Sequence, residues 1–137
     1  MLTNRRTVQI EWGDCDPAGI VYFPRFFELF DASTAALFAK AGFPKHELYE
    51  RYGIAGIPMV DTRARFFSPA TFGDTVEIDS SIAGWGNSSF TVEHKVRKDG
   101  KLMAEGFEKR VWTIRAPEEG GRLKSQAIPQ EVKDRFR

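Results

Sequence analysis

The feature that most constrains the fold is one long apolar segment with helical periodicity. Between Phe23 and Gly42 the large apolar residues recur three and four positions apart, which places them in one stripe on a helix of about five turns. Gly42, with Pro44 two residues later, is typical of a helix C-terminus. A helix with a single stripe needs another element to cover it. The stripe consists of Phe23, Phe26, Phe27, Phe30, Thr34, Leu37, Phe38 and Ala41.

The remaining segments can supply this cover, because their apolar residues alternate as in half-buried strands. Residues 7–12 alternate with Val8, Ile10 and Trp12 on one face, and four further strands are predicted after the helix. They fall within residues 56–69, 74–86, 88–98 and 102–114. Asp99-Gly100 indicates a tight hairpin between the last two. A short helix over residues 44–53 and a helical turn near the C-terminus complete the pattern.

This order of elements predicts one α+β domain that spans residues 1–137. Short connections between the last four strands imply antiparallel neighbours. The long helix and the five-stranded sheet can each bury the apolar face of the other, so the helix should lie across the sheet. Apolar residues on several sides of the helix start indicate further cover, which a second subunit could give.

Composition excludes several classes of partner and cofactor. The net charge is +1, so the chain offers no charge-based argument for binding nucleic acid or an anionic membrane. No apolar run is long enough to span a bilayer, and we find no signal peptide. One cysteine and two histidines give no disulfide and no metal ligand set, and this usage fits a cytoplasmic protein.

The segment "GDCDPAG" separates the first strand from the helix and places Asp16 directly before Pro17. Two interpretations of Asp16 remain open. Asp followed by Pro is a favoured way to cap the start of a helix. Alternatively, unpaired N–H groups of the first helical turn hold a developing oxyanion. A nearby carboxylate could then attack a carbonyl carbon or take a proton from water, which is the apparatus of acyl transfer.

The longer stretch "GDCDPAGIVYFPRFFELFDA" closely resembles the signature of the 4-hydroxybenzoyl-CoA thioesterase family, and "GIPMV", "GDTVEI" and the later "IP" also match that family. The resemblance implies a hotdog fold, in which a five-stranded antiparallel sheet wraps around one long central helix. It implies hydrolysis of an aromatic (4-hydroxybenzoyl-like) or medium-chain acyl-CoA to the free acid and CoA. No cofactor is implied, since coenzyme A is part of the substrate.

The resemblance also implies roles for individual residues. Asp16 becomes the nucleophile or general base, and the backbone N–H of Phe23 polarises the thioester carbonyl. The implied substrate-binding residues are Gly19, Ile20, Val21, Tyr22, Asp31, Ile57 and Pro58. Asp31 would meet a polar group on an aromatic acyl chain, although Asp is more often simply exposed. The family further implies a homodimer with the thioester between subunits, and pairing of two dimers into a homotetramer.

Other interpretations compete with this one. A non-hydrolytic hotdog protein, either a dehydratase or an acyl-CoA-binding module, is the main alternative, although hotdog dehydratases usually rely on a histidine that the signature segment lacks. Asp14 is predicted to form a turn, Cys15 to pack, and His94 to be a hydrogen-bonded core residue. The cations of the last two strands are predicted to be mainly a solvated face: Lys95, Arg97, Lys98, Lys101, Lys109, Arg110 and Arg115.

Overall fold

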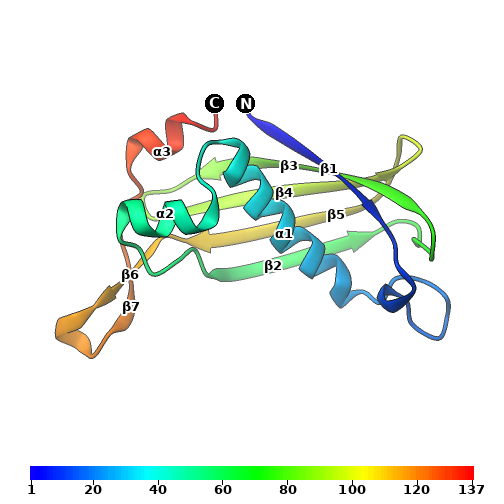
Figure 1. Ribbon diagram of the computed structural model, residues 1–137, viewed down its shortest axis with the longest axis horizontal. Coiled ribbons are helices and arrows are strands. Elements are labelled where there is room, and N and C mark those ends of the chain that lie inside the picture. The colour runs from blue at the N-terminus through cyan, green and yellow to red at the C-terminus, as the bar shows by residue number, and fades with distance from the viewer.

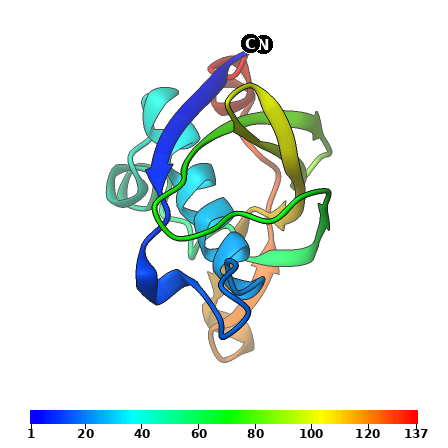
Figure 2. The ribbon, with the colours of Figure 1, turned by 90° about the vertical axis from the view of Figure 1, so that its right-hand side faces the viewer.

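A computed structural model describes all 137 residues. Five strands form one antiparallel sheet in the order β1-β3-β4-β5-β2, and α1 (Pro24–Lys40) lies across one face of it (Figure 1). The sheet curves around α1 when the molecule is viewed from the end (Figure 2). This arrangement confirms the predicted α+β hotdog fold. The strands are β1 (Thr3–Gln9), β2 (Met59–Phe66), β3 (Thr75–Trp85), β4 (Ser89–Lys98) and β5 (Lys101–Val111).

The smaller elements lie mainly at the two ends of the sheet. A 3₁₀ turn, η1 (Trp12–Asp14), follows β1, and α2 (Lys45–Tyr52) follows α1. Beyond β5 come β6 (Thr113–Ala116), η2 (Pro117–Glu119), β7 (Arg122–Ser125) and α3 (Gln130–Asp134). The chain ends meet, with the N–H of Leu2 donating to the carbonyl of Phe136. No helix has the length and hydropathy needed to cross a membrane.

The apolar stripe of α1 packs against the sheet as predicted, but it starts one turn later. Phe26, Phe30, Leu37 and Phe38 are buried, whereas Phe23 precedes the helix and is 58% exposed. Gly42 ends the helix with a φ of +98°, and the N–H of Phe43 donates to the carbonyl of Phe38 at 2.9 Å. This hydrogen-bond pattern is the glycine-dependent helix end that the sequence predicted.

Gly106 of β5 allows α1 to approach the sheet closely. A Cβ atom at this position would lie 2.5 Å from Cε2 of Phe30, which is closer than non-bonded carbon atoms come. The ring of Phe30 also stacks on His94 of β4, with centroids 4.8 Å apart and planes 8° apart. Phe30 therefore lies flat on the middle of the sheet because β5 has no side chain there.

The inward-facing positions of the central strands agree with the predicted alternation. Val76, Ile78, Ser80 and Ile82 of β3 are buried, and so are Phe90, Val92, His94 and Val96 of β4. The hairpin at Asp99 and Gly100 has positive φ at both residues, as the Asp-Gly signal predicted. These agreements place the core between α1 and the middle of the sheet.

Two details of the predicted strands are wrong. Trp12 does not continue the inward face of the first strand, because β1 ends at Gln9 and the chain turns into η1. Its side chain is 73% exposed and packs edge-on against Phe72, with ring centroids 5.5 Å apart. The predicted strand over residues 102–114 is also divided, because Thr113 leaves the sheet to bond with Gly56 and to start the β6–β7 hairpin.

Candidate active site

The signature loop, defined as residues 10–23, is held in place by backbone hydrogen bonds. The N–H of Asp16 donates to the carbonyl of Ile20 at 2.9 Å, and the N–H of Gly19 donates to the carbonyl of Asp16 at 2.9 Å. The N–H of Val21 donates to the carbonyl of Ala70 at 2.9 Å, which ties the loop to the segment before β3. Gly19 has a φ of +82°, a conformation that favours glycine. The loop is therefore a fixed structure at one end of the sheet.

Asp16 does not cap the long helix. Its Oδ1 atom accepts the N–H of Ala18 at 2.8 Å, while the N-cap position of α1 is Phe23, seven residues later. The interpretation of Asp16 as the cap of this helix is therefore wrong. The carboxylate is half-buried, and its second oxygen has no hydrogen-bond partner in the chain. Asp16 thus keeps one oxygen available for a substrate or a water molecule.

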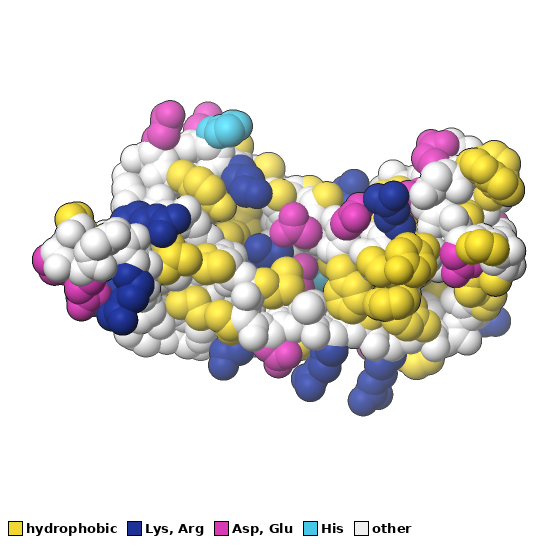
Figure 3. Space-filling model, turned by 90° about the horizontal axis from the view of Figure 1, so that it is seen from below, with side chains coloured by type: hydrophobic (Ala, Val, Ile, Leu, Met, Phe, Trp, Pro, Cys, Tyr) yellow, Lys and Arg dark blue, Asp and Glu magenta, His cyan; other side chains and the backbone are white.

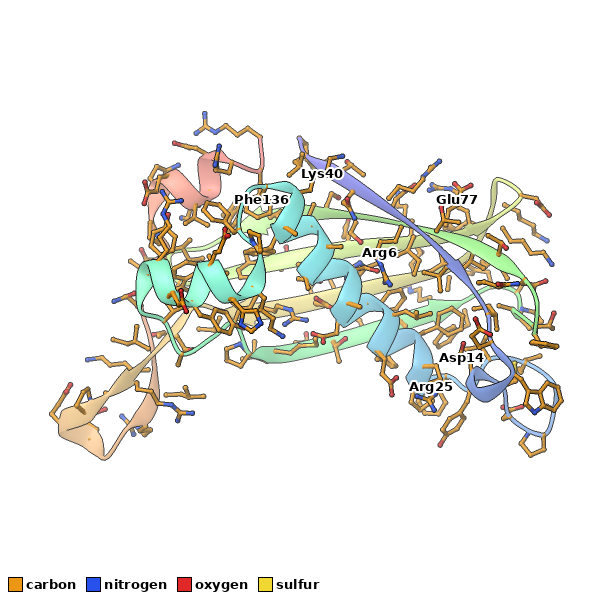
Figure 4. The ribbon with its side chains drawn as sticks, viewed as in Figure 1. Arg6, Asp14, Arg25, Lys40, Glu77 and Phe136 are labelled. Carbon is orange, nitrogen blue, oxygen red and sulfur yellow. The ribbon has the colours of Figure 1, made fainter.

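Asp14, in contrast, has a structural task. Its Oδ2 atom accepts the N–H of Glu11 at 2.9 Å, and its backbone carbonyl accepts the N–H of Tyr22 at 2.8 Å. Figure 4 shows Asp14 at the end of the molecule where α1 begins, as the bond to Tyr22 requires. The prediction that Asp14 forms a turn is confirmed. Cys15, which follows it, is half-buried, and its thiol contacts the Glu11 carbonyl at 3.7 Å.

The start of α1 offers one unpaired donor. The N–H groups of Val21, Tyr22, Arg25 and Phe26 donate to backbone carbonyls, and Pro24 has no N–H. Phe23 alone in this stretch has an N–H group without an acceptor. The N-terminal end of a helix also carries partial positive charge, which favours a negatively charged oxygen at this position. The backbone of Phe23 is therefore suited to bind an oxyanion.

An apolar hollow of about 400 Å³ lies beside this donor. Figure 3 shows the apolar side chains gathered at the corresponding end of the face that carries β2. A volume of this size falls in the range of small-molecule sites. Asp16 is not part of the lining, but its backbone is bonded to Ile20, which is. The lining comprises Ile20, Val21, Phe23, Phe26, Phe66, Phe67, Ser68, Pro69 and Ala70.

The predicted substrate-binding residues fall into two separate groups in one chain. Gly19, Ile20, Val21 and Tyr22 belong to the signature loop, with Ile20 and Tyr22 exposed and Val21 buried. Asp31 and Ile57 instead line a second, smaller cleft between α1, α2 and the segment before β2. The carbonyl of Pro58 next to it accepts the N–H of Val111 at 3.1 Å. Within one chain, the structure does not bring the two groups into one cavity.

A set of buried polar residues, here called the central polar cluster, lies between α1 and the middle of the sheet. It comprises Thr34, Ser80, His94, Glu108 and Arg110. Oε1 of Glu108 accepts the hydroxyl of Thr34 at 2.6 Å and Nε of Arg110 at 2.9 Å. The hydroxyl of Ser80 is 2.7 Å from Nδ1 of His94. The prediction of a hydrogen-bonded core histidine is confirmed.

The charges in the cluster shift the pKa of its members. Burial alone would raise the pKa of Glu108, but His94 and Arg110 outweigh it and hold that pKa below its ordinary value. Arg110 is the stronger partner, because Nε2 of His94 lies 3.4 Å from Oε2 of Glu108, too far for a good hydrogen bond. Burial would lower the pKa of Arg110, yet Glu108 and then Asp31 raise it. Glu108 and Arg110 are therefore both ionised within the core.

Sequence reasoning missed this cluster, and the prediction that Arg110 belongs to the solvated face is wrong. The side chain of Arg110 is 8% exposed and that of Glu108 is 1% exposed. Both residues share the inward face of β5 with Ala104 and Gly106. The signal was available in this alternation, but Phe107 gives the opposite face of the strand an apolar character as well. No group of three or more His, Cys, Asp or Glu side chains is placed to hold a metal ion.

Comparison with known proteins agrees with the geometry. The Thioesterase-like superfamily matches residues 10–136. The 4-hydroxybenzoyl-CoA thioesterase of Pseudomonas sp. strain CBS-3 is 36% identical over 130 residues, which cover 90% of this chain and 89% of that protein. Its solved structure superposes with a TM-score of 0.89 at 30% identity, over 98% of this chain and 99% of the other.

A second solved structure, of a gentisyl-coenzyme A thioesterase, superposes with a TM-score of 0.85 at 32% identity. It covers 98% of this chain and all of that one. Three findings point to common ancestry with these thioesterases: the match to the superfamily, the identity over nine-tenths of the chain, and the shared arrangement of α1 and the sheet. The chain belongs to the thioesterase-like superfamily, as a hotdog-fold member of the 4-hydroxybenzoyl-CoA thioesterase family.

Proposed function

We propose that the protein hydrolyses the thioester bond of an aromatic acyl-coenzyme A, releasing the aromatic acid and free CoA. The observation that carries the proposal is the unpaired Phe23 N–H at the start of α1, in the same fixed loop as the Asp16 carboxylate. An oxyanion donor and a carboxylate are the two groups that acyl transfer needs. In a member of a thioesterase family, this pairing supports thioester hydrolysis.

In the proposed reaction, the thioester carbonyl oxygen accepts the Phe23 N–H and gains negative charge as the carbonyl carbon is attacked. Asp16 acts in one of two ways. As a general base, it takes a proton from a water molecule whose oxygen attacks the carbon. As a nucleophile, it attacks the carbon itself, and water then hydrolyses the resulting anhydride. In both cases the C–S bond breaks and CoA leaves as the thiolate, which is then protonated.

The aromatic class of substrate is supported by two observations. The hollow beside Phe23 includes three further phenylalanine side chains, from Phe26, Phe66 and Phe67, and aromatic rings pack favourably against one another. Two relatives named above act on aromatic acyl groups that carry hydroxyls, 4-hydroxybenzoyl-CoA and gentisyl-CoA. A medium-chain acyl group would also fit the hollow, but it would gain nothing from the aromatic side chains of the lining.

We further propose that the active unit is a homodimer. The outer edge of β2 is unpaired, and apolar side chains surround it, since Val60 is 59% exposed, Phe66 47% and Phe67 53%. An unpaired strand with exposed apolar residues is suited to pairing with the same strand of a second copy. Antiparallel pairing of two β2 strands would bring Ile57 and Pro58 of one copy toward the signature loop of the other. Pairing of two dimers into a tetramer is the assembly that the family leads us to expect.

A dehydratase is disfavoured by the position of the histidines. His94 is 1% exposed and lies beneath the ring of Phe30, where no substrate carbon can reach it. His46 is exposed on α2, outside the signature loop. The other alternative is a protein that binds acyl-CoA without hydrolysing it, and an activity measurement distinguishes this from a thioesterase.

The experiment is a thiol-release assay on a panel of aromatic and aliphatic acyl-CoAs. Asp16→Asn should lower kcat about 100- to 10,000-fold on the preferred substrate, the usual contribution of a general base, without unfolding the protein. Asp14→Asn is the matched control, because asparagine can still accept the Glu11 N–H, and we expect nearly normal activity. If the Asp16→Asn enzyme keeps its full rate, or the native protein hydrolyses none of the panel, the proposed function is wrong.

A further inference from the structure

A short segment before β3, here called the bracing segment and defined as residues 70–74, holds the signature loop at both of its ends. Near the end of the loop, Ile20 and Thr71 form an isolated antiparallel bridge. At the start of the loop, the N–H of Ile10 donates to the carbonyl of Asp74 at 2.8 Å. The two ends of the signature loop are therefore tied to the same few residues.

The bracing segment supports the backbone on either side of the candidate reacting groups. The bridge to Thr71 fixes Ile20, whose carbonyl accepts the N–H of Asp16 at 2.9 Å. The preceding residue of the segment accepts the N–H of Val21 at 2.9 Å, two residues before the free N–H of Phe23. A shift of this segment would therefore move the carboxylate relative to the oxyanion donor.

The side chain of Asp74 fixes the shape of the bracing segment. Its Oδ2 atom accepts the N–H of Thr71 at 2.9 Å and the hydroxyl of the same residue at 3.2 Å. Its Oδ1 atom accepts a hydrogen bond from Nζ of Lys98 at 2.7 Å. Lys98 is the last residue of β4, so this bond anchors the segment to the sheet. The signature loop, the start of β3 and the β4–β5 hairpin lie at the same end of the molecule (Figure 1).

The interaction between Asp74 and Lys98 fixes geometry more than it adds stability. Hydrogen bonds from Lys98 and then from the Thr71 backbone hold the pKa of Asp74 below its ordinary 3.8, although burial opposes them. The Lys98 side chain is 41% exposed, and ion pairs with an exposed partner usually add little to stability. Position, however, affects a rate strongly, since a displacement of about 1 Å at a reacting group can cost about 100-fold.

Asp79 of β3 gives a comparison within the same sheet. It too bonds to a cation near the end of β4, because a terminal nitrogen of Arg97 donates to its Oδ2 at 2.9 Å. The side chains of Asp79 and Asp74 are 18% and 13% exposed. The other side-chain partner of Asp79 is Arg5 of β1, so none of its side-chain bonds reaches the signature loop or the bracing segment. The two aspartates differ mainly in what they hold.

We propose that Asp74, anchored by Lys98, is a positioning residue for thioester hydrolysis. Through the bracing segment it sets where the Asp16 carboxylate lies relative to the Phe23 N–H. This inference rests on the proposed thioesterase function. Neither Asp74 nor Lys98 lines the apolar hollow beside the donor, so both act through the backbone of the signature loop.

The first test measures kcat and KM on the preferred acyl-CoA of the panel. Asp74→Asn has only one acceptor oxygen, so it cannot accept from both Thr71 and Lys98. It should lower kcat about 10- to 100-fold and leave KM within a few-fold of native, because the reacting groups are displaced while the hollow keeps its lining. Lys98→Met should lower kcat by less, and Lys98→Arg, which keeps a charged donor, should restore it. The double variant should be no slower than Asp74→Asn, since the two residues act as one unit.

Asp79→Asn is the matched control and should keep the native kcat. Lys98→Met covers the case in which Asp74→Asn fails to fold, because a partly exposed lysine tolerates substitution. Melting temperatures confirm that each variant is folded at the assay temperature.

Amide hydrogen exchange tests the bracing without any need for activity. In Asp74→Asn the amides of Ile10, Asp16 and Val21 should exchange about 10-fold faster than in the native protein, the effect of weakening one hydrogen bond. The amides in the middle of β4 should keep their native rates.

Three results overturn the proposal. The first is a kcat of Asp74→Asn that falls no further than that of Asp79→Asn. The second is a loss of kcat in folded Lys98→Met that Lys98→Arg does not restore, or a KM that rises as much as kcat falls. The third is unchanged exchange in the signature loop, which would show that Asp74 does not hold it. A native protein that hydrolyses none of the panel would instead overturn the thioesterase function and the positioning role, and faster loop exchange in Asp74→Asn would then show bracing alone.

Discussion

The signature loop and the central polar cluster both place charged or polar groups beside α1, but they treat hydrogen bonding in opposite ways. In the loop, one oxygen of Asp16 and the N–H of Phe23 have no partner, and several apolar side chains around them are exposed: Ile20, Tyr22, Phe23, Phe66 and Phe67. In the cluster, the side chains are 0–8% exposed, and Glu108 and Arg110 bond to one another, to two residues of α1 and to the Ile57 carbonyl before β2. Hydrogen-bonding capacity is left free in the first region and is almost fully used in the second.

This difference separates residues that meet a ligand from residues that orient them. A free donor at a helix start and an exposed aromatic hollow are available for binding, whereas a buried, bonded arginine can act only through what it holds. Substitutions in the loop should therefore reduce activity and spare stability. Substitutions in the cluster should reduce stability first.

Glu108→Ala should give the largest effect and tests the cluster side of the comparison. It leaves Arg110 charged and buried without its main partner, which typically costs about 3–5 kcal/mol of unfolding free energy. Urea denaturation of this variant and of Asp16→Ala measures the contrast, and we expect Asp16→Ala to cost less than about 1 kcal/mol. Glu93→Ala, on the exposed side of β4, is the control. Similar stabilities for Glu108→Ala and Glu93→Ala would contradict the structural role of the cluster.

Phe23→Pro is the corresponding test of the loop. Phe23 has a φ of −52°, which proline can adopt, so the change removes the N–H with little strain at that residue. Loss of one oxyanion donor should lower kcat about 100- to 1,000-fold, equivalent to about 2.7–4 kcal/mol of transition-state stabilisation. The variant Phe23→Ala removes the ring but keeps the N–H, and it should retain most activity in the thiol-release assay. Equal rates for the two variants would show that the donor is not used.

How far the sequence predicts these two regions depends on the range of the interactions that form them. The period of the α1 stripe, the alternation in β3 and β4, and the Asp99-Gly100 turn are local patterns, and each is confirmed. The signature loop was found because its residues are contiguous. The roles of Asp16 and Phe23 remain predictions, but their free hydrogen-bonding groups agree with them.

The central polar cluster depends instead on residues far apart in the chain. Thr34 and Glu108 are 74 positions apart, and Asp31 and Arg110 are 79 apart. A charged residue on a strand is usually exposed, so the sequence pattern predicted that Arg110 faces solvent, which is wrong. Only the register of β5 against β4 and the position of α1 over them show that Glu108 and Arg110 face inward.

Gly106→Ala should have a smaller effect and sharpens the description of the cluster. The added methyl group would overlap the ring of Phe30, which covers His94, and overpacking of this kind costs about 1–3 kcal/mol. Thermal unfolding measures the change. Gly84→Ala is the control, because a Cβ atom there would lie 3.5 Å from Thr91 Oγ1, an ordinary contact. A loss of stability in the Gly84 variant alone would mean that the approach of Phe30 to β5 is not limiting.

The smallest expected effect concerns Asp79 on the outer face of the sheet, far from both regions. Hydrogen bonds from Arg5, at 2.7 and 2.9 Å, hold the pKa of Asp79 below its ordinary 3.8 in spite of partial burial, and Arg97 adds to this. A carboxyl whose pKa is depressed by folding stabilises the native state above its ordinary pKa, and that contribution is lost as the pH falls through the depressed value.

Asp79→Asn should therefore lower the melting temperature slightly at neutral pH, and the difference from the native protein should fade as the pH falls through the depressed pKa of Asp79. Added salt should reduce the difference at neutral pH, because the Arg5 side chain is 56% exposed and the pair is screened. Thioester hydrolysis should not change. A difference that persists at low pH would mean that Asp79 acts through packing rather than charge. A loss of activity would mean that the outer face of the sheet takes part in function. The outer face would then be a third functional region beside the signature loop and the central polar cluster.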